Sequence, residues 1–225
     1  MSQLKQLEGM RRNFFANVSH ELRTPMTVLQ GYLEMTEDPD MIVGPMWTKA
    51  HGVMTEQLNR MNSLVNQLLT LSKIEAAPMH ELEDVVNVPS MLEVLEKEAV
   101  SLSGDDQHQL KFDVDSSLRV LGDDDQLRSA ISNLVYNAVK YTPEDGKVEV
   151  IVDHFGVMVA DSGIGISDQD KLYVCRPMYR ADKSRTEQGN GLGLSLVDAV
   201  LSKHNARLIL RDNKPGLRVR LYFAH

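Results

Sequence analysis

The sequence is poor in cysteine, in aromatic residues and in net positive charge. A single cysteine among 225 residues excludes an intrachain disulfide and any metal site that needs several cysteines, and it suits a reducing cytoplasm. The net charge of −8 argues against a nucleic acid or an anionic membrane surface as a partner. No apolar run approaches the roughly 20 residues that span a bilayer, and no secretory signal is visible. These absences favour a cytoplasmic protein, with any membrane anchor outside this sequence.

Apolar residues recur at helical spacing through the first third of the chain. The pattern predicts one helix over residues 2–37 and a second that ends near residue 76, separated by helix breakers at 38–40 and 44–45. The apolar residues of the second helix alternate between spacings of three and four, as in a helical bundle: Ala50, Met54, Leu58, Met61, Val65, Leu68 and Leu71. Such a hairpin has too few partners for its apolar surface, so we expect a homodimer that forms a four-helix bundle. A monomeric hairpin packed on the second domain is the alternative.

The residue pattern changes after residues 76–78, where a proline ends the second helix. We therefore expect a first domain over residues 1–77 and a second over residues 78–225, with a hinge between them. Strands and helices alternate in the second domain without the rhythm of a doubly wound fold, which predicts an α/β sandwich with helices on one face of a mixed sheet. The expected strands are 85–88, 109–114, 148–152, 157–160, 207–210 and 217–223, and the expected helices are 89–103, 123–141 and 194–203.

A histidine followed by an acid lies in the middle of the first predicted helix. Thr24 lies one turn beyond His20 on the same face. Pro25 has no amide hydrogen, so the carbonyl group of Glu21 loses its helical partner and we expect a bend there. Imidazole is a competent nucleophile near neutral pH, and an adjacent carboxylate can accept its proton. A surface or satisfied core histidine is the alternative that this segment alone leaves open.

A polar stripe follows one side of the helix predicted over residues 123–141. Asn133, Asn137 and Lys140 share this side, whereas the opposite side is apolar. An asparagine carbonyl oxygen suits magnesium beside phosphate oxygens, and a lysine supplies a positive charge for a phosphate. An exposed polar helix face without any ligand would show the same pattern.

Two glycine-rich segments lie farther along the chain. Residues 161–166 follow a predicted strand; their glycines let the backbone approach a flat ligand, and Asp161 can accept a hydrogen bond from an amine. Residues 189–194 open a predicted helix, whose amide groups and positive dipole end favour phosphate. The second segment does not fit a Walker loop, because Gly-Lys-Ser/Thr is absent.

Together these segments resemble the sequence boxes of two-component sensor histidine kinases. Residues 19–25 resemble the H box, 133–141 the N box, 161–166 the G1 box and 189–194 the G2 box. The resemblance implies a dimeric helical hairpin followed by an ATP-binding domain of the GHKL, or HATPase, type that uses ATP and Mg²⁺. It makes Asn137 the magnesium ligand and Asp161 the residue that binds the adenine amino group. The other nucleotide-binding residues that it implies are Asn133, Lys140, Tyr141, Gly163, Gly165, Gly189, Gly191, Leu192 and Gly193.

The family resemblance also implies a reaction. His20 would take the γ-phosphoryl group of ATP, with Glu21 as its base, and pass it to an aspartate in the receiver domain of a response regulator. Thr24 would position water for the reverse removal of phosphate from that partner, and Arg180 would contact the transferring phosphate. The regulator should dock on the facing part of the second helix and on residues just beyond the histidine: Thr27, Val28, Gly31 and Tyr32. The chain would then be the cytoplasmic fragment of a sensor that is anchored in the inner membrane.

One segment departs from the family pattern. The F box usually has a phenylalanine before Tyr-Arg, whereas this chain has Met178 there, preceded by Cys175, Arg176 and Pro177. Residues 176–188 are polar and predict a mobile lid. Two other functions stay open: a catalytically weakened dimeric scaffold or phosphatase with an altered lid, and a different ATPase whose hydrolysis does not depend on His20. Labelled ATP separates them, because only a kinase transfers acid-labile label to His20.

Residues 1–150 show a closer likeness to one branch of the family. Residues 12–20, 67–78 and 125–133 carry this likeness. Beyond Gly156 the likeness to that branch fades, whereas the family likeness persists.

Overall fold

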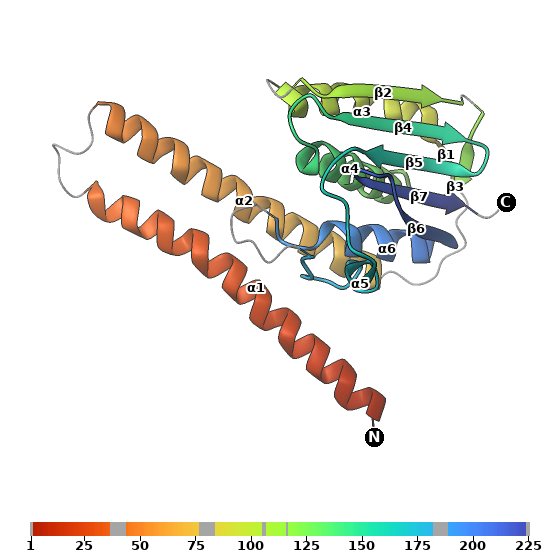
Figure 1. Ribbon diagram of the computed structural model, residues 1–225. Helices are drawn as coiled ribbons and strands as arrows, with labels where there is room; N and C mark the ends of the chain where they lie inside the picture. The colour runs from red at the N-terminus through yellow and green to blue at the C-terminus, as the bar shows by residue number, and fades with distance from the viewer. Residues whose placement is uncertain are drawn as a thin grey trace. The chain divides into compact units, whose positions relative to one another are not determined.

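The computed structural model describes residues 2–36, 44–76, 84–104, 107–115, 117–181 and 189–223. The chain divides into two compact units, Met1–Thr70 and Leu71–His225, and each is described by itself (Figure 1). The boundary between the two units falls inside the second helix, earlier than the predicted domain boundary. The predicted hinge at residues 77–78 lies outside the described residues.

The first unit consists of helix α1 (Ser2–Met35) and most of helix α2 (Pro45–Ala76). Pro45 stands at the start of α2, where its missing amide hydrogen breaks no helical hydrogen bond. Gly44 before it has a φ of +86°, a conformation that favours glycine. α1 continues through Pro25, which is buried. Both helices therefore lie where the apolar spacing predicts them.

Five strands form the main sheet of the second unit, in the order β2-β4-β5-β7-β6 (Figure 1). Their bounds are β2 (Gln109–Val114), β4 (Lys147–Asp153), β5 (Gly156–Asp161), β6 (Ala206–Asp212) and β7 (Leu217–Phe223). β2 runs parallel to β4, whereas the other neighbouring strands are antiparallel, so the sheet is mixed as predicted. A second, two-stranded sheet pairs β1 (Val85–Asn87) with β3 (Arg119–Leu121). The sequence did not predict β3, because three residues are too few to show a period.

Helices α3 (Val88–Ser103), α4 (Asp124–Tyr141) and α6 (Gly193–Lys203) cover one face of the main sheet (Figure 1). The side chains of Asn87 and Asp123 cap α3 and α4 by accepting hydrogen bonds from backbone amides inside the first turn. A short helix, α5 (Asp168–Lys171), lies in the connection between β5 and α6 and was not predicted. This arrangement confirms the predicted sandwich of helices on a mixed sheet.

The core of the second unit lies between the sheet and these helices. Alternate residues of β4 are buried, as the two-residue period of a strand requires, and they belong to one cluster with residues of α4 and α6. Ile74 in the last turn of α2 is 2% exposed and belongs to the same cluster. The cluster fixes α4 and α6 against the sheet.

A buried histidine joins the end of α6 to the start of α4. The Nδ1 atom of His204 lies 2.7 Å from the carbonyl oxygen of Val200, and its Nε2 accepts a hydrogen bond of 3.0 Å from the amide of Asp123. A Cβ on Gly122 would lie 2.4 Å from the His204 ring, so only glycine fits beside it. α4 and α6 are thereby tied together at the end opposite to the predicted site.

Candidate active site

His20 lies exposed on α1, so a ligand or partner can reach its ring. The hydroxyl of Thr24, one turn along, donates a hydrogen bond of 3.2 Å to the backbone carbonyl of His20. The hydroxyls of Ser19 and Thr27 bond back to carbonyls of the preceding turn in the same way. The Thr24 oxygen can still accept a hydrogen bond, so its predicted role in positioning water stays a prediction.

Glu21 pairs with a residue that the sequence reading did not single out. Its carboxylate accepts a hydrogen bond of 3.1 Å from Arg60 on α2, and the two side chains are 28% and 32% exposed. Among the described residues, no hydrogen bond joins Glu21 to the ring of His20. Arg60 therefore holds the carboxylate that was predicted to act as the base. The separation of 39 residues gives no local signal for this pair.

A groove of about 550 Å³ lies beyond His20 between α1 and α2. Its lining includes all four α1 residues that were predicted to contact a response regulator, Thr27, Val28, Gly31 and Tyr32. Met35, Met46, Lys49 and Ala50 complete it. The groove is mostly apolar, with a lysine at one side.

The polar stripe of α4 meets the start of α6. Asn133 donates from Nδ2 to the carbonyl of Ser129 at 2.8 Å, which fixes the orientation of its amide. A Cβ on Gly193 would lie 3.2 Å from Asn133 Oδ1 and 3.2 Å from Asn137 Nδ2. The absence of a side chain at Gly193 thus lets the α6 N-terminus approach the two asparagines.

One turn farther along, α4 also meets Gly189 of the second glycine segment. A Cβ on Gly189 would lie 3.1 Å from the hydroxyl of Tyr141 and 3.5 Å from Lys140 Nζ. Lys140 Nζ lies 5.4 Å from the centroid of the Tyr141 ring. Five predicted nucleotide residues (Asn133, Asn137, Lys140, Tyr141 and Gly193) therefore converge with Gly189 in one place.

The first glycine segment reaches the C-terminal end of α4. The amide of Ile164 donates to the carbonyl of Tyr141 at 3.3 Å, and a Cβ on Gly163 would lie 2.2 Å from that oxygen. Gly165 has a φ of +67° and lies against Gly216 of the β6–β7 hairpin. Glycine is thus required at both positions, by close approach at the first and by backbone conformation at the second.

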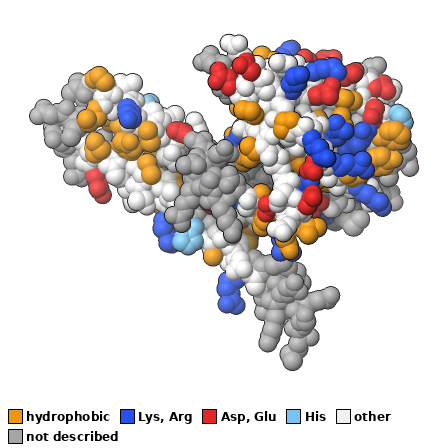
Figure 2. Space-filling model, in the orientation of Figure 1, with side chains coloured by type: hydrophobic (Ala, Val, Ile, Leu, Met, Phe, Trp, Pro, Cys, Tyr) orange, Lys and Arg blue, Asp and Glu red, His pale blue; other side chains and the backbone are white. Residues whose placement is uncertain are grey.

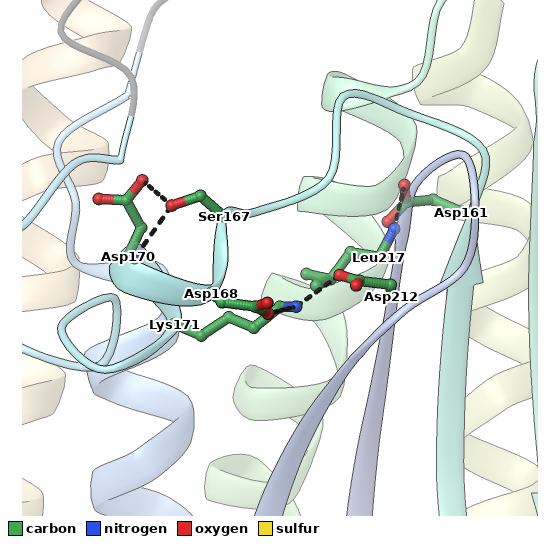
Figure 3. Close-up of polar contacts among 7 residues, drawn as sticks. All are labelled: Asp161, Ser167, Asp168, Asp170, Lys171, Asp212 and Leu217. Carbon is green, nitrogen blue, oxygen red and sulfur yellow. Dashed lines mark hydrogen bonds and ion pairs between the residues drawn. The ribbon is translucent and has the colours of Figure 1, made fainter.

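Asp161 lies at the end of β5 and is 7% exposed (Figure 3). Its Oδ1 atom accepts hydrogen bonds from the amides of Gly163 at 2.8 Å and Leu217 at 3.1 Å. Burial raises the pKa of Asp161 above its usual value, more than these two hydrogen bonds lower it. Because Oδ1 is held by two amides, the carboxylate has a fixed orientation and its second oxygen is available to an amine.

The two ends of the predicted lid meet at Gly191. The amide of Met178 donates to the Gly191 carbonyl at 2.9 Å, and both residues have positive φ, +64° and +68°. A Cβ on Gly191 would lie 2.6 Å from the carbonyl oxygen of Tyr179. Arg180 is half-buried at the near end of the lid, whereas residues 182–188 of the predicted lid lie outside the described residues.

Charged and polar pairs fasten the segment before the lid (Figure 3). Lys171 pairs with Asp168 at 2.8 Å and with Asp212 on β6. Asp170 accepts hydrogen bonds from the hydroxyls of Ser167 at 2.7 Å and Tyr179 at 2.6 Å. These polar pairs anchor the segment that leads into the lid.

Cys175 lies in the same segment. Burial raises the pKa of its thiol to about 11. The sulfur is therefore protonated at neutral pH and is a poor nucleophile.

The N-terminus of α6 is suited to an anion. No side chain caps it, because its N-cap residue is Leu192. The Asn190 side chain accepts from the Leu192 amide at 3.2 Å and orders the loop just before the helix. Uncapped amides, the positive helix end and Lys140 together can hold phosphate oxygens.

The residues fit ATP with a magnesium ion bound mainly by the nucleotide. Among the described residues, no three side chains of His, Cys, Asp or Glu are grouped to hold a metal. Magnesium typically keeps several water and phosphate ligands and needs few from protein, so the side-chain oxygen of Asn137 would be enough to hold it. At Gly163, Gly189 and Gly193 the lack of a side chain lets both glycine segments approach α4 closely.

Family models match both parts of the chain. "His Kinase A (phospho-acceptor) domain" matches residues 10–77, and "Histidine kinase-, DNA gyrase B-, and HSP90-like ATPase" matches residues 122–225. This chain belongs to the sensor histidine kinases. Within that family, the phosphate regulon sensor protein PhoR of Pseudomonas aeruginosa is 41% identical over 222 residues.

That alignment covers 96% of this histidine kinase chain and 50% of PhoR, so the chain spans about half the length of this relative. PhoR represents the branch of the family that residues 12–20, 67–78 and 125–133 resemble. The alignment with PhoR extends beyond residue 150.

Solved histidine kinases share the fold. AdeS of Acinetobacter baumannii has a TM-score of 0.70 at 22% identity over 91% of this chain and 97% of AdeS. ThkA, solved in complex with the response regulator protein TrrA, has a TM-score of 0.71 at 20% identity over 98% of this chain and 64% of the matched chain. At these identities the likeness concerns the fold alone.

Among the described residues, no helix is both long and apolar enough to cross a membrane.

Proposed function

We propose that this chain is the catalytic core of a sensor histidine kinase that phosphorylates His20 from ATP. One observation carries the proposal. In the second unit Asn133, Asn137 and Lys140 meet the second glycine segment and Tyr141 meets the first, while the same chain exposes His20 on a two-helix unit. A nucleotide site in one unit and an exposed nucleophile in the other are the two parts that phosphoryl transfer needs.

In the proposed reaction a ring nitrogen of His20 attacks the γ-phosphorus of ATP. The bond from that phosphorus to the β–γ bridging oxygen breaks and ADP leaves, while the ring proton passes to Glu21. Magnesium, when bound, offsets negative charge on the phosphate oxygens. Asn137 would hold it, Lys140 would pair with a phosphate, and Asp161 would accept a hydrogen bond from the adenine amine. Arg180 would contact the transferring phosphate.

The phosphoryl group would then pass to an aspartate of a response regulator. The groove lined by Thr27, Val28, Gly31 and Tyr32 is the proposed docking place, since it lies just beyond His20 on the same unit. Because PhoR is a relative, we propose a PhoB-like receiver domain as the partner. Thr24 would position water to remove phosphate from that partner. The protein would work as a homodimer and as the cytoplasmic part of an inner-membrane sensor.

Labelled ATP tests the kinase proposal. The wild type, incubated with γ-³²P-ATP and Mg²⁺, should acquire label that is lost in acid and kept in alkali. His20→Ala should acquire none, whereas His51→Ala should be labelled like the wild type. His51 is the matched control because it is an exposed histidine on α2 of the same unit.

The two other functions give different results. Steady ATP hydrolysis that is unchanged in His20→Ala would identify a different ATPase. ATP binding without any label on the wild type would identify the weakened scaffold or phosphatase. Label retained in His20→Ala would reject His20 as the acceptor.

A further inference from the structure

The helices leave one face of the main sheet open, and its last two strands carry four arginines there. Arg207 and Arg211 on β6, and Arg218 and Arg220 on β7, alternate with residues that are more buried on the core side. Figure 2 shows lysine and arginine side chains gathered over this part of the second unit. We call these four residues the arginine face.

The positive charge of the arginine face is not balanced locally. Arg211 lies directly opposite Arg218 in the antiparallel pair of β6 and β7. Like charges in such positions destabilise a sheet. Arg207 and Arg211 make no hydrogen bond or ion pair with any residue that the structure describes. A chain with a net charge of −8 therefore keeps a local excess of positive charge.

Two carboxylates on strands of the same sheet already have partners. Asp153 on β4 pairs with Arg220, and Asp212 at the end of β6 pairs with Lys171. Arg218 donates to the side chain of Asn213, which is neutral, at 2.9 Å. Further carboxylates that neutralise Arg207 and Arg211 must therefore come from outside this surface.

Protection of a sheet edge explains only part of this pattern. β6 is an edge strand, and charged side chains on edge strands hinder aggregation. β7 lies between β5 and β6, so Arg218 protects no edge, whereas Arg220 is accounted for by its pair with Asp153. Arg218, whose partner Asn213 is neutral, points together with Arg207 and Arg211 to recognition of an anionic group.

Exposed apolar side chains lie among the arginines. Ile209, between Arg207 and Arg211, is 37% exposed, and Tyr222, opposite Arg207, is also 37% exposed. The ring of Phe155 stacks on Tyr222 with centroids 5.8 Å apart and is 41% exposed. Arginine and aromatic residues together are typical of protein interfaces.

We propose that the arginine face docks an acidic segment of a partner protein. At least two carboxylates of that segment pair with Arg207 and Arg211, and an apolar side chain covers Ile209 and Tyr222. A protein is favoured over a nucleic acid or an anionic membrane, because those need a broad basic surface and this chain is acidic overall. The face is a binding surface additional to the residues that act on ATP.

Arg211→Glu gives a test in which stability and binding change in opposite directions. It replaces the repulsion between Arg211 and Arg218 by an attraction, so the melting temperature should stay level or rise. The probe is a fluorescein-labelled peptide, Glu-Asp-Ile-Glu-Asp-Tyr-Glu, followed by fluorescence anisotropy. The substitution should weaken peptide binding by roughly tenfold or more, because it removes a charge-assisted pair and adds repulsion. ATP binding should not change.

Lys97→Glu is the matched control, because it makes the same charge change at an exposed lysine on α3. It should bind the peptide like the wild type. Equal peptide affinity in the two variants, or no binding at millimolar peptide, overturns the proposal. Phosphatidylglycerol vesicles or a DNA duplex that bind more tightly than the peptide and require Arg211 overturn it as well. Self-association that Arg211→Glu abolishes would assign the face to a second copy and overturn it too.

Discussion

Glu21 is placed by a residue of the opposite helix, and this gives a test at the level of single side chains. Arg60 bonds the Glu21 carboxylate at 3.1 Å, so Arg60→Met should leave that carboxylate free to adopt other rotamers. We expect the phosphorylation rate of His20 to fall on the order of 10- to 100-fold, because a base must be held close to the proton it accepts. Single-turnover labelling at saturating ATP measures this rate.

A double-mutant cycle shows whether Arg60 acts through Glu21. Glu21→Gln should itself slow labelling by roughly 10²- to 10⁴-fold. Adding Arg60→Met to Glu21→Gln should then have little further effect, since the carboxylate that Arg60 positions is already lost. Equal losses from Arg60→Met in both backgrounds would show that Arg60 acts independently of Glu21.

Asp161 should decide adenine recognition. Its Oδ1 must stay with the amides of Gly163 and Leu217, so Asp161→Asn turns an NH₂ group, instead of an oxygen, toward the adenine amine. Two donors then face each other, and ATP affinity should fall roughly 10- to 100-fold. Calorimetry with a non-hydrolysable ATP analogue measures this. The control is Asp198→Asn, which changes an exposed aspartate on α6 and should leave ATP affinity unchanged.

The raised pKa of Asp161 gives opposite pH dependences for binding and stability. Recognition of the amine needs the ionised carboxylate, so ATP affinity is lost as pH falls through the raised pKa, at a higher pH than the usual 3.8. The protonated form favours folding, and this contribution to stability is lost as pH rises through the same pKa. Asp161→Asn should therefore be at least as stable as the wild type at pH 7, by differential scanning fluorimetry. A lower melting temperature there would contradict the burial argument.

The positions of single site residues were predictable where the pattern is local in sequence. The stripe of Asn133, Asn137 and Lys140 follows from a helical period, and the glycines follow from their spacing before a helix. Arg60 was not predictable, because its partner is 39 residues away and either residue alone resembles a solvated surface charge. The lid anchor formed by Lys171 and Asp212 joins residues 41 positions apart and was missed for the same reason.

His204 controls how two elements sit together. His204→Ala would remove the hydrogen bond to the Asp123 amide and the contact with the Val200 carbonyl, and would leave a cavity beside Gly122. We expect the free energy of unfolding of the second unit to fall by about 2–4 kcal/mol. Because α4 and α6 also meet at Gly193, ATP affinity should fall with it. Urea denaturation and calorimetry measure the two effects.

The control for this substitution is His154→Ala, because His154 is an exposed histidine in the turn between β4 and β5. It should change the free energy of unfolding by no more than about 1 kcal/mol. Equal destabilisation by the two substitutions would show that the link between α4 and α6 is unimportant.

The elements were predicted well because their periods are strong. All three covering helices and all five main strands lie where apolar spacing placed them, since residues such as Val148 and Val150 alternate with less buried neighbours. β3 and α5 were missed, because elements of three and four residues show no period. Strand order also could not be read from the sequence, since the pairing of β5 with β7 joins distant segments.

The first unit leaves apolar stripes uncovered on both helices. Leu58, Val65 and Leu69 on α2 are 50%, 41% and 55% exposed, and their spacings of seven and four put them on one side of the helix. Phe15, Met26 and Leu33 form a similar exposed stripe on α1. The sequence predicted Leu58 and Val65 to lie on a buried face, and the single chain does not bury them. A second copy that packs as a four-helix bundle would cover both stripes.

Leu58→Glu tests this assembly at the scale of the whole molecule. The carboxylate would be buried without a partner in a bundle of two hairpins, so dimers should give way to monomers in sedimentation experiments. Leu172→Glu is the control, because Leu172 is a 75% exposed leucine of the second unit and its substitution should leave the mass unchanged. ATP binding should survive in both variants, since the proposed nucleotide-binding residues all belong to the second unit. An unchanged dimer mass for Leu58→Glu would mean that these stripes are covered by something other than a second hairpin, and that His20 works outside a four-helix bundle.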